Sequence, residues 1–144
     1  MRRWFLIAAA LCATLVYAES PPIGYVKNVT GDASVVTAGQ ARKAEVGTSV
    51  HVGSVLRTGQ QASLGVTFKD ETVMSFGPNT ELTVDQYLYE PGQGKLRMNG
   101  KLAKGSMNYV SGVIAKLQPD AVTVTTPAGV IGVRGTQFLL KVEE

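Results

Sequence analysis

Residues 62–77, ASLGVTFKDETVMSFG, decide the fold class of this chain. The first half alternates apolar side chains with small or polar ones, the apolar positions being Leu64, Val66 and Phe68. Such a period of two places the apolar side chains on one face of an extended strand. The turn-tolerant run KDET interrupts the alternation, which Met74 and Phe76 then resume. The stretch therefore predicts a β-hairpin with one buried face.

The same period of two recurs along the rest of the chain. Its apolar positions are Leu82 and Val84, Val122 and Val124, and Phe138, Leu140 and Val142. Apart from the first 18 residues, no stretch shows a helical stripe, and 16 glycines suit many tight reversals between short strands. We expect an all-β chain forming a single domain of short strands.

Four glycines, Gly47, Gly53, Gly59 and Gly65, lie six residues apart, and the fourth residue of each hexad is apolar. Because six is even, these apolar residues would share one face, as in the stacked coils of a β-solenoid or β-roll. A jelly-roll-like β-sandwich with a chance glycine spacing is the alternative. The residues alone leave both architectures open.

Residues 1–18 have the composition of a helical signal peptide. Arg2 and Arg3 supply the positive charge, an apolar run follows, and Val16-Tyr17-Ala18 places small residues at the cleavage positions. The run is shorter than the roughly 18 to 20 residues that cross a bilayer, so we expect cleavage after Ala18 and no membrane span in the mature chain. The expected location is periplasmic or secreted.

Residues 19–23 contain two prolines and predict a short extended lead-in to a domain over residues 24–144. The only cysteine, Cys12, lies in the signal peptide, so the mature chain would have neither thiol nor disulfide. Without Arg2 and Arg3, twelve basic residues face eleven acidic ones, a net charge of +1. These dispersed charges do not predict a nucleic-acid partner.

Catalysis and metal binding are not expected. His51 is the only histidine and lies in a Val-His-Val run, where an outward-facing strand position is the simplest role. Asp70 and Glu71 could attract calcium, but a solvated turn is a much more common role for such a pair. We therefore predict no catalytic residue, no metal and no cofactor.

Tyr87 and Tyr89 occupy one face of a predicted strand. Two rings on one face could form a small platform for a glycan or a protein, and packing at the sheet edge is the alternative. Both tyrosines are candidate binding residues.

Four segments resemble the FecR domain family, named for an iron-dicitrate signalling regulator. They are GSVLRTG at 53–59, VTFKDET at 66–72, FGPNTEL at 76–82 and VTTPAGVIGVRGTQF at 124–138. The last is similar to the closing signature of the family, and the resemblance extends over about residues 24–142. It implies structural roles for Gly53, Gly59, Asp70, Pro78, Thr126, Pro127, Gly132 and Gly135.

The resemblance implies an exported, non-enzymatic module that binds a protein or senses a signal in the cell envelope. Glycan or peptidoglycan binding and assembly through strand edges are the alternatives. Glu71 departs from the family, which usually has glycine there, and residue 144 ends the chain where regulators continue. Because only Met1 to Arg3 precede the apolar run, we expect no anti-sigma activity.

Arg134 and Thr136 in the closing signature are further candidate binding residues. Glycines beside Arg134 would let a ligand approach, and a guanidinium suits carboxylate or phosphate. The interpretation that we favour is structural: Arg134 would bond nearby carbonyls or a carboxylate such as Asp70.

Overall fold

The computed structural model describes residues 21–133 and 135–142. The predicted signal peptide, its cleavage site and Arg134 lie outside these residues. The strands are β1 (Gly24–Thr30), β2 (Ala33–Thr37), β3 (Gln40–Lys43), β4 (Ser49–Val50), β5 (Val55–Thr58), β6 (Ser63–Phe68), β7 (Val73–Phe76), β8 (Glu81–Glu90), β9 (Lys95–Val110), β10 (Val122–Thr126), β11 (Gly129–Gly132) and β12 (Gln137–Val142). The helical segments are η1 (Pro91–Gln93), α1 (Val113–Leu117) and η2 (Pro119–Ala121).

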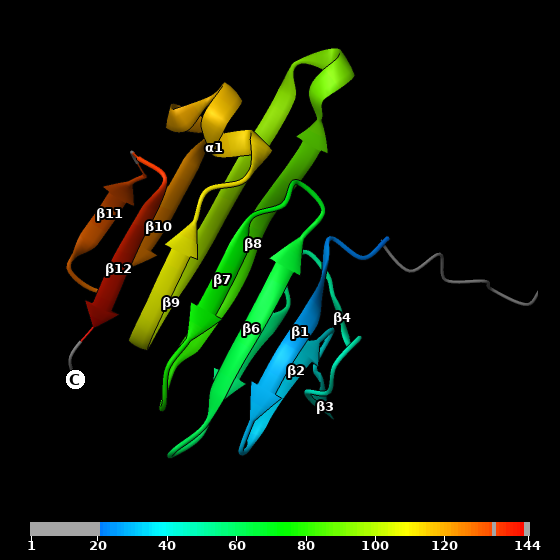
Figure 1. Cartoon of the computed structure of the whole chain (residues 1–144), viewed down its shortest axis with the longest axis vertical. Coiled ribbons are helices and arrows are strands. Elements are labelled where there is room, and N and C mark those ends of the chain that lie inside the picture. The colour runs from blue at the N-terminus through cyan, green and yellow to red at the C-terminus, as the bar shows by residue number, and fades with distance from the viewer. Residues whose placement is uncertain (1–20, 134, 143–144) are drawn as a thin grey trace, which may run out of the picture.

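The strands form one curled, open sheet in the order β3-β2-β5-β8-β9-β7-β6-β1-β4, with β10, β11 and β12 branching from β9. Figure 1 shows the sheet folded over, so that β6 and β7 lie in front of β8 and β2. All pairings are antiparallel except that of β9 with β10. The all-β class of short strands is thus confirmed.

Strand β9 joins the two layers because it passes from one into the other. Its first part pairs with β8 and β10, and its last six residues pair with β7 and β12. The change occurs at Gly105, whose φ of 92° is left-handed. A Cβ at this position would also collide with Thr80. Glycine is therefore required where the strand crosses.

The core lies between the layers and contains nine of the twelve apolar positions that the alternation singled out, whereas Phe138, Leu140 and Val142 are half-buried. Leu64, Val66, Phe68, Met74, Phe76, Leu82, Val84, Val122 and Val124 are all buried. The predicted hairpin is present, with β6 paired to β7 across the turn at residues 69–72. Local alternation therefore identified the inner face correctly.

The glycine hexads do not stack as consecutive coils. Strand β4 pairs with β1, β5 pairs with β2 and β8, and β6 pairs with β1 and β7. The three strands that follow the hexad glycines are thus not neighbours of one another. Gly47 and Gly53 instead serve turns, with φ of 94° and 86°.

The short helix α1 was not expected from the sequence, because five residues cannot show a helical stripe. It follows β9 and, with η2, leads the chain from one layer to the other. None of the helices in the described part of the chain has the length and hydropathy needed to cross a bilayer.

Candidate functional site

Asp70 lies in the β6–β7 turn and is completely buried. Its Oδ1 accepts hydrogen bonds from the Tyr87 hydroxyl at 2.9 Å and the Thr72 amide at 3.3 Å. Its Oδ2 accepts from the Thr72 hydroxyl at 2.7 Å and the Ile114 amide at 3.1 Å. Every carboxylate oxygen is thus partnered, as a buried charge requires. We call Asp70, Thr72 and Tyr87 the Asp70 cluster.

The Asp70 cluster also holds the start of α1. The residue before this helix is Gly112, which offers no capping side chain. Asp70 takes the role of the missing cap. Its carboxylate accepts from the Ile114 amide, 44 residues further along the chain, and its main-chain oxygen accepts from the Val113 amide at 2.7 Å. A Cβ on Gly112 would collide with the Asp70 and Thr72 backbone. The cluster therefore links the β6–β7 turn to α1.

A β-bulge decides where the two candidate tyrosines point. The pairing of β8 with β9 shifts between Val84 and Gln86, so the inward positions change from Leu82 and Val84 to Tyr87 and Tyr89. Both rings are half-buried against the core, whereas Leu88 between them is exposed. They share one face, as expected, and that face is the inner one.

The Tyr87 ring stacks on Phe68, with 5.6 Å between ring centroids. Its hydroxyl donates to Asp70 Oδ1 and accepts from the Asp70 amide at 3.0 Å. Burial and the Asp70 charge raise the pKa of Tyr87 far above its usual value. These contacts give Tyr87 a packing role, and sugar stacking by the two tyrosines stays a prediction.

Tyr109 lies close to the Asp70 cluster, but its hydroxyl does not take part in the hydrogen bonds of that cluster. It is fully buried, and its hydroxyl has no hydrogen-bond partner among the described residues. Burial raises the pKa of Tyr109 to about 12. The nearby Thr72 side chain lowers this pKa, and the Asp70 charge makes a smaller contribution that raises it. Its ring stacks on Phe138 of β12 at 5.0 Å. Tyr109 thus connects the interior to the last strand.

A second polar group fixes the corner where the β7–β8 connection and β9 pass from one layer to the other. The buried Thr80 hydroxyl donates to the Gly77 carbonyl at 2.9 Å and accepts from the Ser106 amide at 3.0 Å. Thr58 donates to the same Gly77 carbonyl at 2.6 Å and accepts from the Thr80 amide at 2.9 Å. The motif segments 53–59 and 76–82 therefore meet here.

The other motif residues lie in turns. Gly53 and Gly59 donate main-chain bonds to Val84 and Asp32 at 2.7 and 2.8 Å, and the Pro78 carbonyl accepts from Thr80 at 3.2 Å. The Thr126 hydroxyl closes the β10–β11 turn, which contains Pro127, by donating to the Gly129 carbonyl at 3.0 Å.

The closing signature is tied to the end of β9. Ser111 donates from its amide to the Thr136 carbonyl at 2.8 Å and from its hydroxyl to the Gly135 carbonyl at 2.7 Å. Gly132 ends β11 opposite Thr123, and Gly135 has a φ of 99°. Thr136 itself is exposed. The roles predicted for Arg134 lie outside the described residues.

Strand β12 presents a surface that the sequence did not single out. It pairs with β9 along one side, and no other described strand pairs with it. Leu139 points outward and is 75% exposed, and Val130 on neighbouring β11 is 67% exposed. The inward residues Phe138, Leu140 and Val142 are only half-buried. This open side of β12 is called the β12 edge below.

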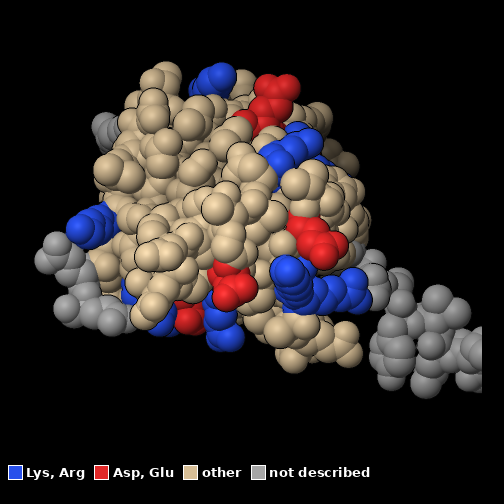
Figure 2. Space-filling view, turned by 60° about the horizontal axis from the view of Figure 1, so that its bottom comes forward, with Lys and Arg blue, Asp and Glu red and all other residues tan. Residues whose placement is uncertain are grey.

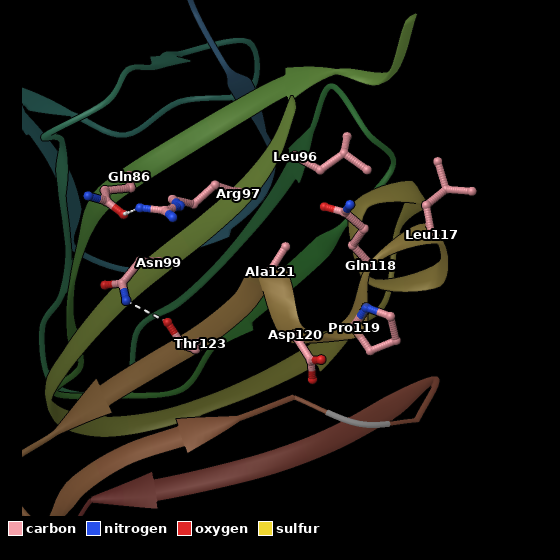
Figure 3. Close-up of a pocket in the computed structure, with 10 residues that line it drawn as sticks. All are labelled: Gln86, Leu96, Arg97, Asn99, Leu117, Gln118, Pro119, Asp120, Ala121 and Thr123. Carbon is pink, nitrogen blue, oxygen red and sulfur yellow. Dashed lines mark hydrogen bonds between the residues drawn. The ribbon is translucent and has the colours of Figure 1, made fainter. Parts of the chain in front are cut away.

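A groove lies between the start of β9 and the α1–η2 segment and has a volume of about 730 Å³. Figure 3 shows Gln86, Arg97, Asn99 and Thr123 on the strands and Leu117 to Ala121 on the opposite wall. Asn99 Nδ2 donates to the Thr123 hydroxyl at 2.5 Å, and Arg97 donates to Gln86 at 3.4 Å. We call it the β9 groove.

The charged side chains are dispersed. Figure 2 shows one end of the molecule, where Lys, Arg, Asp and Glu surround a broad uncharged area. Among the described residues, no group of three His, Cys, Asp or Glu side chains is close enough to hold a metal ion. His51 follows β4, is half-buried, and its amide donates to the Ser54 hydroxyl at 2.9 Å.

Comparison with known proteins gives one family. The family model described as FecR protein matches residues 54–144, from the residue before β5 to the end of the chain. Strands β1 to β4 precede this match, although the sequence resemblance was expected from about residue 24. No curated protein and no solved structure shows a significant match.

Proposed function

The chain belongs to the FecR family, a family of signalling-regulator domains, and on this premise we propose that it is a non-enzymatic binding module of the cell envelope. Its partner is a protein that adds a strand to the β12 edge. The observation that carries the proposal is the combination of an unpaired strand side with the exposed Leu139.

Strand addition suits the β12 edge because both components of such binding are present. Main-chain N–H and C=O groups on the open side can pair with an incoming strand, which supplies affinity. The partner's inward side chains would bury more of the half-buried Phe138, Leu140 and Val142. Its outward side chains would pack against the exposed Leu139.

The edge strand β3 is less suitable for pairing with a partner strand. Strand β3 is also a sheet edge, but it has only four residues, and Arg42 and Lys43 are among them. Short length and positive charge are common means of preventing edge pairing. Strand β12 has six residues with Lys141 as its single charged side chain. Strands β4 and β11 also pair along one side only, but they have two and four residues. Among the described strands of this kind, β12 therefore offers the longest open edge.

Envelope location is supported by the signal peptide predicted over residues 1–18 and by the family. The buried Asp70 carboxylate accepts four hydrogen bonds within the fold, which supports a structural role for it rather than a catalytic one.

The test is affinity capture from envelope extract with the exported wild-type chain and two variants, Leu139→Lys and Val46→Lys. Val46 is the matched control because it is 71% exposed in the loop before β4 and distant in the sheet order from β12. We expect one protein to be recovered by wild type and Val46→Lys and lost with Leu139→Lys. Equal recovery with both variants would exclude the β12 edge.

Assembly of identical copies is a second candidate, favoured by the same open strand. In an antiparallel pair of two β12 strands centred on Leu139, Lys141 would lie opposite Gln137 of the other copy, so no like charges would face each other. Sedimentation equilibrium distinguishes the candidates. A concentration-dependent dimer that Leu139→Lys abolishes would favour assembly, and a monomer at high concentration would exclude it.

A further inference from the structure

The β9 groove is bounded by an unpaired piece of strand. Strand β10 pairs with β9 only from Val122 opposite Met98 onward, because the chain before Val122 turns away into η2. The first three residues of β9, Lys95 to Arg97, pair with β8 on one side. No described strand occupies their other side, where Leu96 and Arg97 line the groove, so the main-chain groups directed to that side have no main-chain partner among the described residues.

The groove walls combine polar and apolar side chains. The polar ones are the carboxamides of Gln86, Asn99 and Gln118, the Arg97 guanidinium, the Asp120 carboxylate and the Thr123 hydroxyl. The apolar ones are Leu96, Leu117, Pro119 and Ala121, of which Leu117 is 59% exposed. Carboxamides can both donate and accept, which suits a ligand with alternating N–H and C=O groups.

The charges of the groove lie on opposite walls. Arg97 is on β9 and Asp120 is on η2, and neither forms an ion pair with another described residue. Within residues 21–133 and 135–142, the Arg97 guanidinium donates one hydrogen bond, to Gln86 at the long distance of 3.4 Å. Arg97 is therefore available for a carboxylate of a ligand, for which its planar donors are well suited.

We propose that the β9 groove binds an extended peptide segment that continues the line of β10, pairs with Lys95 to Arg97 and places an acidic side chain on Arg97. A segment at this position would cover Leu96 and Leu117 with its own apolar side chains. The site is separate from the β12 edge and gives the module a second binding position.

A peptide explains the groove better than a saccharide does. Sugar rings are commonly held against aromatic faces, whereas none of the lining residues is aromatic. The unpaired strand segment, in contrast, matches a peptide main chain directly. The saccharide remains the outcome that the test must be able to reveal.

The experiment selects binders from a library of random linear ten-residue peptides displayed on phage, using the whole exported chain as bait. Enriched peptides are then measured by fluorescence polarisation against wild type, Arg97→Glu, Leu117→Glu and Lys101→Glu. Lys101 is the matched control because it is exposed on the same strand but does not line the groove. Thermal unfolding of each variant shows that it remains folded.

We expect enriched peptides that contain an acidic residue, with affinity at least tenfold weaker for Arg97→Glu and Leu117→Glu and less than twofold weaker for Lys101→Glu. N-methylation of alternate peptide amides should abolish binding, because it removes the donors of an added strand. Leu139→Lys should leave peptide affinity unchanged, which separates this site from the β12 edge.

Two results would overturn the proposal. One is a selection without enriched peptides, or with peptides whose affinity does not depend on Arg97. The other is binding of soluble peptidoglycan oligosaccharides that Arg97→Glu abolishes, in the absence of peptide binding, which would assign the groove to a saccharide.

Discussion

Asp70 and Leu139 both depart from the usual distribution of residue types, in opposite directions. The charged Asp70 is fully buried, and the large apolar Leu139 is mostly exposed. Four hydrogen bonds compensate for the burial of Asp70, whereas no packing compensates for the exposure of Leu139. The unusual polar residue therefore serves the fold, whereas the proposed role of the unusual apolar one is to contact a partner.

The largest effect on stability is expected for Asp70→Ala. The substitution leaves the Tyr87 and Thr72 hydroxyls and two amides without their acceptor inside the protein, and it uncaps α1. We expect a loss of about 3 kcal/mol or more in the free energy of unfolding, measured by urea denaturation. Asp85→Ala, at an exposed position of β8, is the control and should change this free energy by less than about 0.5 kcal/mol. Similar values for the two variants would contradict the structural role of Asp70.

Tyr87→Phe should have the next largest effect. It removes one donor to the Asp70 carboxylate and one acceptor for the Asp70 amide while keeping the ring on Phe68. Hydrogen bonds to charged groups contribute about 1.5 to 3 kcal/mol, so we expect a loss of about 2 kcal/mol. An unchanged denaturation midpoint would show that the Asp70 cluster does not depend on Tyr87.

Tyr109→Phe should have the opposite sign at neutral pH, because the buried hydroxyl has no hydrogen-bond partner in the described part of the chain. We expect a gain of up to about 1 kcal/mol. The pKa of about 12 in the folded state exceeds the ordinary value of 10.0, so the folded protein keeps a proton that the unfolded chain releases above pH 10. Stability of the wild type should therefore fall between pH 10 and 12, and less steeply in Tyr109→Phe. Equal slopes would contradict this.

Glu71→Gly tests the departure of this chain from its family. Glu71 has a φ of 71°, a left-handed conformation that costs about 1 kcal/mol or more for a residue with a Cβ. Glycine should therefore stabilise the β6–β7 turn by up to about 1 kcal/mol in thermal or urea unfolding. Glu71→Ala keeps the Cβ and is the control, for which no such gain is expected. A gain with alanine would point to the charge of Glu71 instead.

Leu139→Lys should have the smallest effect on stability and a large one on binding. The side chain is exposed, so we expect a change of less than about 0.5 kcal/mol in the free energy of unfolding. Capture of the partner should nevertheless be lost. A destabilisation of 2 kcal/mol or more would show that Leu139 belongs to the packed structure.

Local alternation was sufficient to predict the inner faces of β6, β7 and β10 and of the first part of β8, whereas it did not single out strands such as β9. Leu64, Val66 and Phe68 face the core as their spacing indicated, because a period of two depends only on neighbouring residues. The glycine hexads were not sufficient to predict the pairing, because β4, β5 and β6 each find partners far away in the sequence. Pairing depends on contacts that local periodicity does not contain.

The candidate sites were predicted less well than the strands. The two tyrosines share a face, as predicted. The β-bulge that turns this face toward the core could not be predicted from the pattern of apolar residues. The alternation places Leu139 on the outward face with Gln137 and Lys141, but it does not indicate that one side of β12 lacks a partner strand among the described residues. The β9 groove arises from the point where β10 begins, which depends on the turn into η2.

The most direct test of the central claim is hydrogen exchange of the chain in the presence and absence of the protein recovered by capture. Strand addition predicts that amides on the open side of β12 exchange at least tenfold more slowly in the complex, while those of the charged edge strand β3 are unchanged. Slower exchange of the β3 amides, or an unchanged exchange rate of the β12 amides, would contradict the account and place the binding surface elsewhere.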